Sequence, residues 1–494
     1  MRRLSLATLG SVPRDIAQPA FDIRTLPVGI VHLGIGAFHR AHMAAYSQDA
    51  LALEKGSWGV CGVSLRSADI RDRLTPQDGL YTLVVRGRDA ETLSIIGTVR
   101  EVLFAPENPA HVLARIADPA IKIVSLTVTE KGYCHDPATG ALREDDAGIV
   151  HDLQHAAAPK TAIGMLVRGL QARCQADAGP VTVLCCDNLP HNGRTVRGVV
   201  MRFAELVEAD LASWIEANVA FPSTMVDRIV PATTAADREA VAKRLGLEDA
   251  SPVVAEPFRQ WVIEDRFAAG RPCWERVGAE FVADVGPYED MKLRLLNGSH
   301  SAMAYLGYLA SYEFIWQVIA DKAFDGYVAR LMEEASTTLA LPAGVDVARY
   351  RRELIERFAN PALGHRCRQI AMDGSQKLPQ RLLGTIRDRL KRGASIDALG
   401  LAVAAWIRYV RGVDEKGAAY EVQDPLAARL RPLAVGYASE AVDRVLSVTE
   451  VFGNDLPGNG TFRATLVTWL EKLDREGAQQ TVEFACASRV AETT

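Results

Sequence analysis

The sequence predicts two domains: an α/β N-terminal domain built on a mainly parallel sheet, and a mainly α-helical C-terminal domain. The chain has 494 residues, more than a single hydrophobic core usually covers. In the first half, apolar strand-like runs alternate with helical patterns, as they do in βαβ units. Near residue 285 the pattern changes to amphipathic helices. We therefore place the two domains at residues 1–285 and 286–494.

The first predicted unit is a strand over 29–33, a glycine turn at Gly34-Ile35-Gly36, and a helix over 37–53. Strand, glycine turn and helix open a nucleotide-binding unit of the Rossmann kind. There, backbone N–H groups at the helix N-terminus face a pyrophosphate. His39 stands at the third glycine of the G-x-G-x-x-G motif, so the turn alone also fits an ordinary strand-to-helix connection.

The remaining elements follow in chain order. Further strands are predicted at 58–65, 121–129 and 181–188, with a helix near 160–175, and an inserted hairpin at 80–104. Helices after 285 are expected to break at Pro or Gly near 342, 361, 379, 425 and 457. The apolar run 398–407 is too short to span a bilayer and predicts a buried helix.

Composition limits the kind of partner. A net charge of −5 argues against nucleic-acid binding and against a polybasic membrane anchor. The eight cysteines form no C-x-x-C pair, and the N-terminal segment lacks the apolar stretch of a signal peptide. We therefore expect a reduced, cytoplasmic protein that acts on a small molecule.

The end of the second predicted strand bears on the choice of cofactor. Asp69 would accept hydrogen bonds from adenosine ribose hydroxyls and repel a 2′-phosphate, which favours NAD. Arg66 would instead pair with such a phosphate, and Asp69 also fits a helix N-cap. NAD is the expected cofactor, and the expected cofactor-binding residues are Gly34, Ile35, Gly36, Phe38, Arg66 and Asp69.

Polar residues follow several predicted strands and open the helical domain. In an open α/β sheet, ligands bind beyond the carboxyl ends of the strands. Each residue alone also fits a turn or a cap, but their recurrence around one glycine turn favours a site. The candidates are Glu130 and Lys131, Asp187 and Asn188, Asp227, and then Lys292, Asn297 and His300.

A hydride-transferring dehydrogenase needs a base for the hydroxyl proton and donors for the carbonyl oxygen. The sequence has neither a Cys/His cluster with zinc-ligand spacing nor a well-placed Tyr-x-x-x-Lys, so we expect no metal. Lys292 remains as the candidate base, with its pKa brought toward neutral by burial. Asn188 and Asn297 can donate amide N–H groups, and His300 can fix the substrate.

The spacing of these residues raises a geometric difficulty. On an ideal helix, Lys292 and His300 are about 12 Å apart along the axis. Asn297 and His300 share a face, but Lys292 does not. Convergence therefore requires that Lys292 precedes the regular helix, or that the helix is distorted near Asn297-Gly298.

In seven motifs the chain resembles the long-chain mannitol dehydrogenase family. The members of this family are zinc-independent polyol and sugar-acid dehydrogenases. The motifs are HLGIGAFHRAH (32–42), SLTVTEKGYC (125–134), CDNLPHNG (186–193), FPSTMVDRIVP (221–231), EPFRQWVIED (256–265), MKLRLLNGSH (291–300) and DGSQKLPQR (373–381). The resemblance implies a Rossmann-like domain, a helical domain, and a site between them. It also implies that the protein is a monomer or a weak homo-oligomer.

The resemblance also implies roles for single residues. It assigns Lys292 as general acid/base, and Asn188 with Asn297 as the pair that stabilises the oxyanion. It assigns His300 to substrate orientation and Glu130 to a proton relay. It places Asp227 and Lys377 at substrate-contacting positions, and Asp69 at the position that favours NAD.

Within this family, residues 358–381 look more like the fructuronate reductases than the mannitol enzymes. A uronate carries a carboxylate, which Lys131, Arg368 or Lys377 could meet, although Lys131 and Arg368 also fit solvated surface charges. The expected reaction is the reversible reduction of D-fructuronate by NADH to D-mannonate. The alternatives are oxidation of mannitol to fructose, or of arabinitol or sorbitol. A non-catalytic sugar or nucleotide binder is a further alternative, against which the buried base argues.

Overall fold

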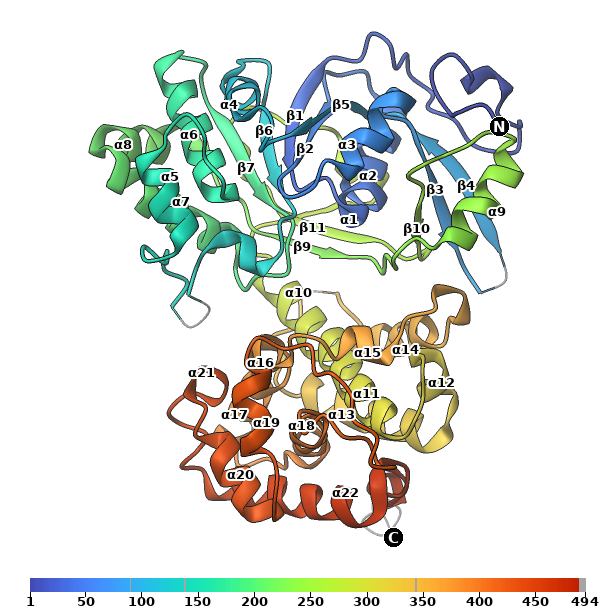
Figure 1. Ribbon diagram of the computed structural model, residues 1–494, viewed down its shortest axis with the longest axis vertical. Helices are drawn as coiled ribbons and strands as arrows, with labels where there is room; N and C mark the ends of the chain where they lie inside the picture. The colour runs from blue at the N-terminus through green and yellow to red at the C-terminus, as the bar shows by residue number, and fades with distance from the viewer. Residues whose placement is uncertain (89, 137–138, 343, 488–494) are drawn as a thin grey trace. The chain divides into compact units, whose positions relative to one another are not determined.

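The computed structural model describes residues 1–88, 90–136, 139–342 and 344–487 (Figure 1). By its internal contacts the chain divides into two compact units, Met1–Gly286 and Pro287–Thr494. The first unit is α/β, and the second is built from helices. Among the described residues, no helix combines the length and the apolar character needed to cross a membrane.

A six-stranded parallel sheet forms the centre of the first unit, in the order β5-β2-β1-β6-β7-β8. Its strands are β1 (Val28–Leu33), β2 (Gly59–Ser64), β5 (Val99–Phe104), β6 (Ile123–Leu126), β7 (Val181–Cys185) and β8 (Val219–Ala220). By order along the chain this is 3-2-1-4-5-6, the doubly wound Rossmann arrangement, which reverses between β1 and β6. The predicted fold class is therefore confirmed, and the ligand-binding edge is the carboxyl end of these strands.

The helices of this unit are α1 (Ala37–Ala41), α2 (Met43–Leu53), α3 (Asp69–Leu74), α4 (Pro109–Ala117), α5 (Ala147–Gln154), α6 (Ala162–Gln175), α7 (Asn192–Val207), α8 (Ala209–Asn218) and α9 (Ala235–Leu245). The prediction of one continuous helix over 37–53 is wrong, because the structure has two helices there, α1 and α2. The break lies at His42, whose backbone has φ −117° and ψ −90°. The buried ring of His42 donates from Nε2 to the carbonyl oxygen of Gln260 at 2.9 Å, so a distant contact fixes the break.

The predicted hairpin is confirmed: β3 (Tyr81–Arg86) and β4 (Glu91–Ile96) are antiparallel. β10 (Val253–Ala255) joins β3 in parallel and extends the hairpin to three strands. A third sheet joins β9 (Thr224–Asp227), β11 (Gln260–Glu264) and β12 (Glu280–Val282). Single-strand patterns did not predict these short pairings, because the partners lie far apart in the chain.

The second unit contains α10 (Gly286–Met291), α11 (Gly298–Leu309), α12 (Ile315–Ala320), α13 (Lys322–Ser336), α14 (Val347–Phe358), α15 (Cys367–Ile370), α16 (Gly374–Leu378), α17 (Gly384–Lys391), α18 (Asp397–Tyr409), α19 (Ala427–Leu433), α20 (Ala438–Leu446), α21 (Thr449–Phe452) and α22 (Gly460–Ala487). The buried helix predicted over 398–407 is confirmed as α18. It contacts α11, α13 and α22 within this unit (Figure 1).

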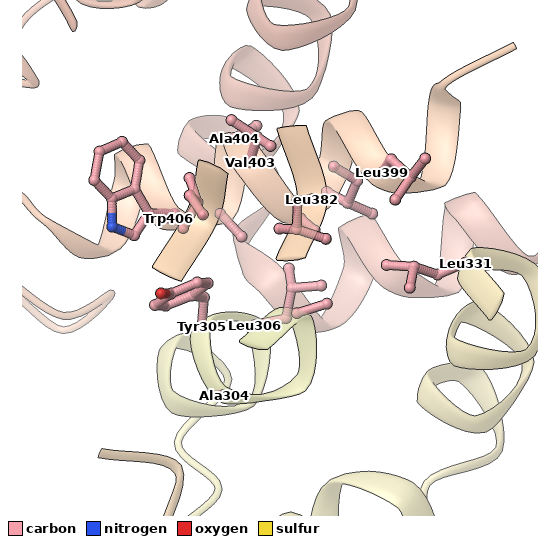
Figure 2. Close-up of a cluster of buried hydrophobic side chains, with 14 of the residues drawn as sticks. Ala304, Tyr305, Leu306, Leu331, Leu382, Leu399, Val403, Ala404 and Trp406 are labelled. Carbon is pink, nitrogen blue, oxygen red and sulfur yellow. The ribbon is translucent and has the colours of Figure 1, made fainter. Parts of the chain in front are cut away.

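The core of this unit forms where α18 meets α11 and α13. Figure 2 shows Tyr305 and Leu306 of α11 near Leu382 and the α18 side chains, with Leu331 and Leu399 also in the cluster. All of these side chains are fully buried. Each buried large apolar side chain contributes roughly 1.5–3 kcal/mol relative to exposure, so this cluster holds α11 firmly in place.

Two π-helical segments interrupt the helices of this unit, η5 (Lys292–Asn297) and η7 (Pro379–Leu383). The predicted break at Pro379 is wrong, because η7 continues α16 into α17 with Leu378, Pro379 and Gly384 all in the right-handed helical region. A proline cannot donate an N–H to the helix ladder and its ring crowds the preceding turn. The wider π turn accommodates the proline without ending the helix.

Candidate active site

The glycine turn after β1 has one structural glycine and one that leaves open space. Gly34 has φ +96°, and a Cβ there would lie 2.2 Å from the carbonyl oxygen of Thr127. Its backbone N–H donates to the carbonyl oxygen of Val63 at 2.8 Å, and that of Ile35 to the same oxygen at 3.2 Å. A Cβ on Gly36 would meet nothing closer than 3.8 Å. Gly36 therefore leaves room for a pyrophosphate to approach the backbone, as a dinucleotide requires.

His39 fills the place of the third glycine by stacking on His32, with 3.5 Å between the ring centroids. The two nitrogens of His32 lie 2.8 Å from Ser125 Oγ and 2.8 Å from Thr127 Oγ1. Burial lowers the pKa of His32 to about 3 and that of His39 well below its usual value. A stacked pair of neutral, buried rings thus packs beside the glycine turn after β1, and one of them, His39, stands where the usual motif has its third glycine.

The other expected cofactor residues lie around this turn. Asp69 is the first residue of α3, which follows β2 after the short connection 65–68, and both Asp69 and Arg66 are exposed. The N-cap of α3 is Ala68, so the capping role does not account for Asp69. Phe38 packs face to face on His42 at 5.0 Å between centroids, which fixes the exit of α1.

The carboxyl ends of β6 and β7 are joined by the carboxylate of Asp187. Oδ2 accepts from the backbone N–H of Val128 at 2.7 Å and from the hydroxyl of Tyr133 at 2.6 Å. Oδ1 accepts from the N–H of Thr129 at 3.3 Å. Burial raises the pKa of Asp187 to about 6, although these hydrogen bonds oppose the shift. Asp187 therefore ties the segment that leads into Glu130 to the segment that leads from β7 to Asn188.

Thr129 has a strained backbone, with φ +67° and ψ 161°. A β-branched residue in the positive-φ region is an outlier that costs on the order of 1–3 kcal/mol. Strain of this kind persists where neighbouring contacts hold it, and here the Asp187 carboxylate holds it. Glu130 follows directly and begins a short 3₁₀ turn over Glu130–Tyr133, so the strain sets its direction. The sequence does not reveal Asp187 as a clamp, since its partners, two backbone N–H groups and the Tyr133 hydroxyl, come from the distant segment that follows β6.

Two further expected residues of this unit differ in exposure. Asp227 ends β9, is buried, and is paired in register with Gln260 of β11. Lys131 is exposed on the 3₁₀ turn. Asp227 therefore has a fixed position in a sheet, whereas Lys131 lies on the surface of the turn.

Lys292, Asn297 and His300 are all nearly buried, at 6%, 7% and 6% exposure. Lys292 and Asn297 are the two ends of the π segment η5, and the N–H of Gly298 donates to the carbonyl oxygen five residues back, that of Leu293. In a π turn the hydrogen bond joins residues i and i+5, which brings Asn297 closer to the face of Lys292 than a regular helix would. Asn297 and His300, at i and i+3, share a face. The helix is thus distorted where the spacing of these residues requires it.

A second π segment holds the first one in place. A Cβ on Gly298 would lie 2.9 Å from the carbonyl oxygen of Arg381 in η7, so only glycine permits this backbone contact. Arg381 then donates from Nη1 to Ser301 Oγ at 3.1 Å. The Asn297-Gly298 pair, which weakens an ordinary helix, ends the π segment at the point where η7 packs against it.

His300 lies in cationic surroundings within the helical unit. Burial lowers its pKa well below the usual value, and His365, Arg381, Arg357 and Lys377 lower it further. The ring of His365 is 4.7 Å from that of His300, edge to face. Of these four neighbours, only Lys377 is among the residues that the sequence predicts for the site.

Lys377 and Arg368 are placed differently. Lys377 donates from Nζ to the carbonyl oxygens of Met372, at 2.5 Å, and Ile370, at 3.5 Å. Arg368 is exposed and lies 3.9 Å from the carboxylate of Glu421. Of the cations expected to meet a substrate carboxylate, Lys377 is therefore the one that lies near His300.

In the part of the chain that the structure describes, no group of three His, Cys, Asp or Glu side chains is placed to hold a metal ion. The eight cysteines all lie in that part and are free thiols. Burial raises the pKa of Cys185 and Cys186, which keeps these thiols protonated.

A doubly wound sheet with a glycine turn at its switch point, followed by a helical unit with a buried lysine, defines a Rossmann-type dehydrogenase of two units. The chain belongs to the mannitol dehydrogenase family. Residues 28–276 match the mannitol dehydrogenase Rossmann domain, and residues 284–474 match the mannitol dehydrogenase C-terminal domain.

Individual relatives are similar over nearly the whole chain. The D-mannonate oxidoreductase of Escherichia coli is 45% identical, over 94% of this chain and 97% of its own. The mannitol 2-dehydrogenase of Phaeosphaeria nodorum is 40% identical, over 97% of this chain and 86% of its own. The solved ternary complex of Pseudomonas fluorescens mannitol 2-dehydrogenase with NAD and D-mannitol superimposes with a TM-score of 0.92 at 39% identity, covering 98% and 99% of the two chains. Relatives named for a sugar acid and for a polyol are thus similar to this chain to nearly the same degree.

Proposed function

We propose that this protein catalyses the reversible reduction of D-fructuronate by NADH to D-mannonate. It is an NAD-dependent oxidoreductase of the mannitol dehydrogenase family that acts on CH–OH groups. The observation that favours a sugar acid over a polyol is the set of cations around His300, namely Lys377, Arg357 and Arg381. A carboxylate pairs strongly with such groups, whereas a polyol offers only hydroxyls.

The first unit fits NAD. The open space at Gly36 lies at the switch point of the sheet, where a dinucleotide pyrophosphate binds in this fold. The carboxylate of Asp69, an exposed residue at the start of α3, is proposed to accept hydrogen bonds from the adenosine ribose. When bound, NAD accepts the hydride that leaves the carbinol carbon.

Lys292 is proposed to take the hydroxyl proton in oxidation and to return it in reduction. A buried amine releases its proton more readily than an exposed one, because burial disfavours the charged form. Asn297, at the other end of η5, is proposed to donate its amide N–H to the substrate oxygen, together with Asn188. His300 orients the substrate from the next turn.

Residues of the first unit are proposed to act on the same substrate. Glu130 would pass the proton between Lys292 and solvent, which its partly exposed position permits. Asp227 would accept hydrogen bonds from substrate hydroxyls, as an ionised carboxylate does. Lys377 of the helical unit would meet the carboxylate.

A substrate panel tests the proposal: D-mannonate, D-mannitol, D-arabinitol and D-sorbitol, each with NAD and NADP, followed by NADH absorbance. We expect kcat/KM for mannonate with NAD to exceed that for mannitol by about tenfold or more, equivalent to about 1.4 kcal/mol. Equal or better turnover of mannitol would instead establish the runner-up reaction, mannitol to fructose. The similarity to the solved complex that holds D-mannitol favours this second candidate.

Replacing Asp187 by asparagine is expected to lower kcat by about 10- to 100-fold, because small displacements of catalytic groups carry penalties of this size. A carboxylate accepts all three donors around it, Val128 N–H, Thr129 N–H and the Tyr133 hydroxyl, whereas an amide turns one N–H₂ toward a donor. Steady-state kinetics beside thermal melts measure the effect. Tyr133→Phe removes one donor only and serves as the milder control. A folded Asp187→Asn with wild-type kcat would show that the clamp does not set the position of Glu130.

A further inference from the structure

His365 is a second histidine beside His300; it lies in the segment 358–381 but is not among the site residues that the sequence predicts. It lies between the short 3₁₀ turn η6 (Pro361–Leu363) and α15, and its ring meets that of His300 edge to face at 4.7 Å. Nδ1 of His365 and Nε2 of His300 are both buried, and neither has a hydrogen-bond partner among the described residues. Buried polar atoms of this kind are normally paired, so two neighbouring exceptions indicate a place where a ligand supplies the partners.

The backbone around His365 is fixed from both sides. Its carbonyl oxygen accepts from the N–H of Ile315 at 3.0 Å, and the N–H of Cys367 donates to the carbonyl oxygen of Glu313 at 2.9 Å. The side chain of Arg366 forms an ion pair with the carboxylate of Glu313. These contacts anchor the loop to the start of α12, so the ring of His365 is held against His300 by the fold itself.

The charges near the two rings are positive. Burial lowers the pKa of His365 to about 4, with a further contribution from Lys377. His300 is also neutral, beside Lys377, Arg381 and Arg357. At neutral pH each imidazole therefore offers one N–H donor and one acceptor nitrogen, while the lysine and the arginines supply charge. A carboxylate suits this combination, because its oxygens accept N–H groups and its charge is offset by the cations.

We propose that His365 is a specificity-determining residue, which binds the carboxylate of a sugar-acid substrate beside Lys377. The inference rests on the proposed function and extends it to a residue outside the catalytic set. His365 donates its ring N–H to a carboxylate oxygen, and Lys377 of α16, whose Nζ also donates to the carbonyl oxygens of Met372 and Ile370, supplies the opposite charge. His300, whose ring contacts that of His365, lies on α11 three residues after Asn297.

The experiment compares His365→Leu and His365→Asn with the wild-type protein, using full-length chains, with D-mannonate and D-mannitol as separate substrates. We expect His365→Leu to raise KM for mannonate about tenfold, and to change kcat/KM for mannitol by less than about twofold, since one charge-assisted hydrogen bond contributes roughly that discrimination. His365→Asn keeps one N–H near the position of Nδ1 and should recover part of the mannonate affinity. His155→Leu, an exposed histidine of the first unit, is the matched control.

The outcomes separate the inference from the function on which it rests. If His365→Leu lowers kcat/KM equally for both substrates, or for neither, then His365 does not bind the carboxylate and the inference fails. Wild-type turnover of mannonate would still support the proposed function. If the wild type itself prefers mannitol, the proposed function fails at that step, before any variant is compared. Thermal melts of each variant confirm that the comparison is made between folded proteins. Partial recovery in His365→Asn, confined to mannonate, is the result that a merely structural histidine would not give.

Discussion

Lys292→Ala is expected to lower kcat by about 10²- to 10⁴-fold, the range that general acid–base catalysis contributes. Lys292 is 6% exposed and stands beside Leu293 and near Leu295 and Leu296, which are also buried. A lysine in such surroundings is costly to charge, because burial disfavours the charged form, and this suits the proposed role of Lys292 as a base. Steady-state kinetics with the best substrate of the panel measure the loss. Oxidation by the wild type should rise with pH as the amine deprotonates, and the variant should lose this dependence.

The variant also distinguishes a chemical lysine from a structural one. NAD binding should be nearly unchanged, because the proposed role of the amine is at the substrate hydroxyl, whereas the proposed nucleotide site is the glycine turn of the first unit. A small external amine should restore part of the rate by entering the space that alanine leaves. Lys391→Ala, an exposed lysine at the end of α17, controls for loss of charge alone. A well-folded Lys292→Ala that retains most of its kcat would end the assignment of Lys292 as the base.

The sequence could predict the parts of the fold that depend on local pattern. The alternation of apolar runs and helices predicted the parallel sheet, and the apolar run 398–407 predicted α18. Buried elements have a recognisable pattern of apolar residues in the sequence. The break at His42 and the continuity through Pro379 could not be predicted. At His42, a hydrogen bond to the distant Gln260 fixes the backbone conformation that breaks the helix. At Pro379, a π turn accommodates the proline, so the helix continues.

The candidate site shows the same division. Lys292, Asn297 and His300 could be identified as candidates from residue type and setting, but the π turn that brings them closer together could not, since a regular helix places Lys292 elsewhere. Asp187 and His365 have contacts with segments far away in sequence, so their environment exists only in the folded chain. Residue types thus indicated the chemistry, whereas the π segment and the long-range contacts supply its geometry.

Asn297→Ala is expected to lower kcat by about 10²- to 10³-fold, the cost of removing one oxyanion donor. Asn297 is 7% exposed and ends η5, where the i+5 spacing of the π turn brings it closer to the face of Lys292 than a regular helix would. Alanine favours a helix more than asparagine does, so the variant should melt no lower than the wild type. A large loss of kcat without a loss of Tm therefore indicates a missing hydrogen-bond donor and not a weakened helix.

Two further variants make this prediction specific. Asn297→Asp keeps the size of the side chain but replaces the N–H donor by a charged acceptor, so it should be impaired at least as much as Asn297→Ala. If Lys292 and Asn297 act on the same substrate oxygen as proposed, the double variant Lys292→Ala/Asn297→Ala should lose less than the product of the single losses. Fully multiplicative losses would mean that the lysine and the asparagine act independently. A kcat within about threefold of the wild type for Asn297→Ala would show that its amide does not meet the reacting oxygen, and the approach of Asn297 to Lys292 in η5 would then have no part in catalysis.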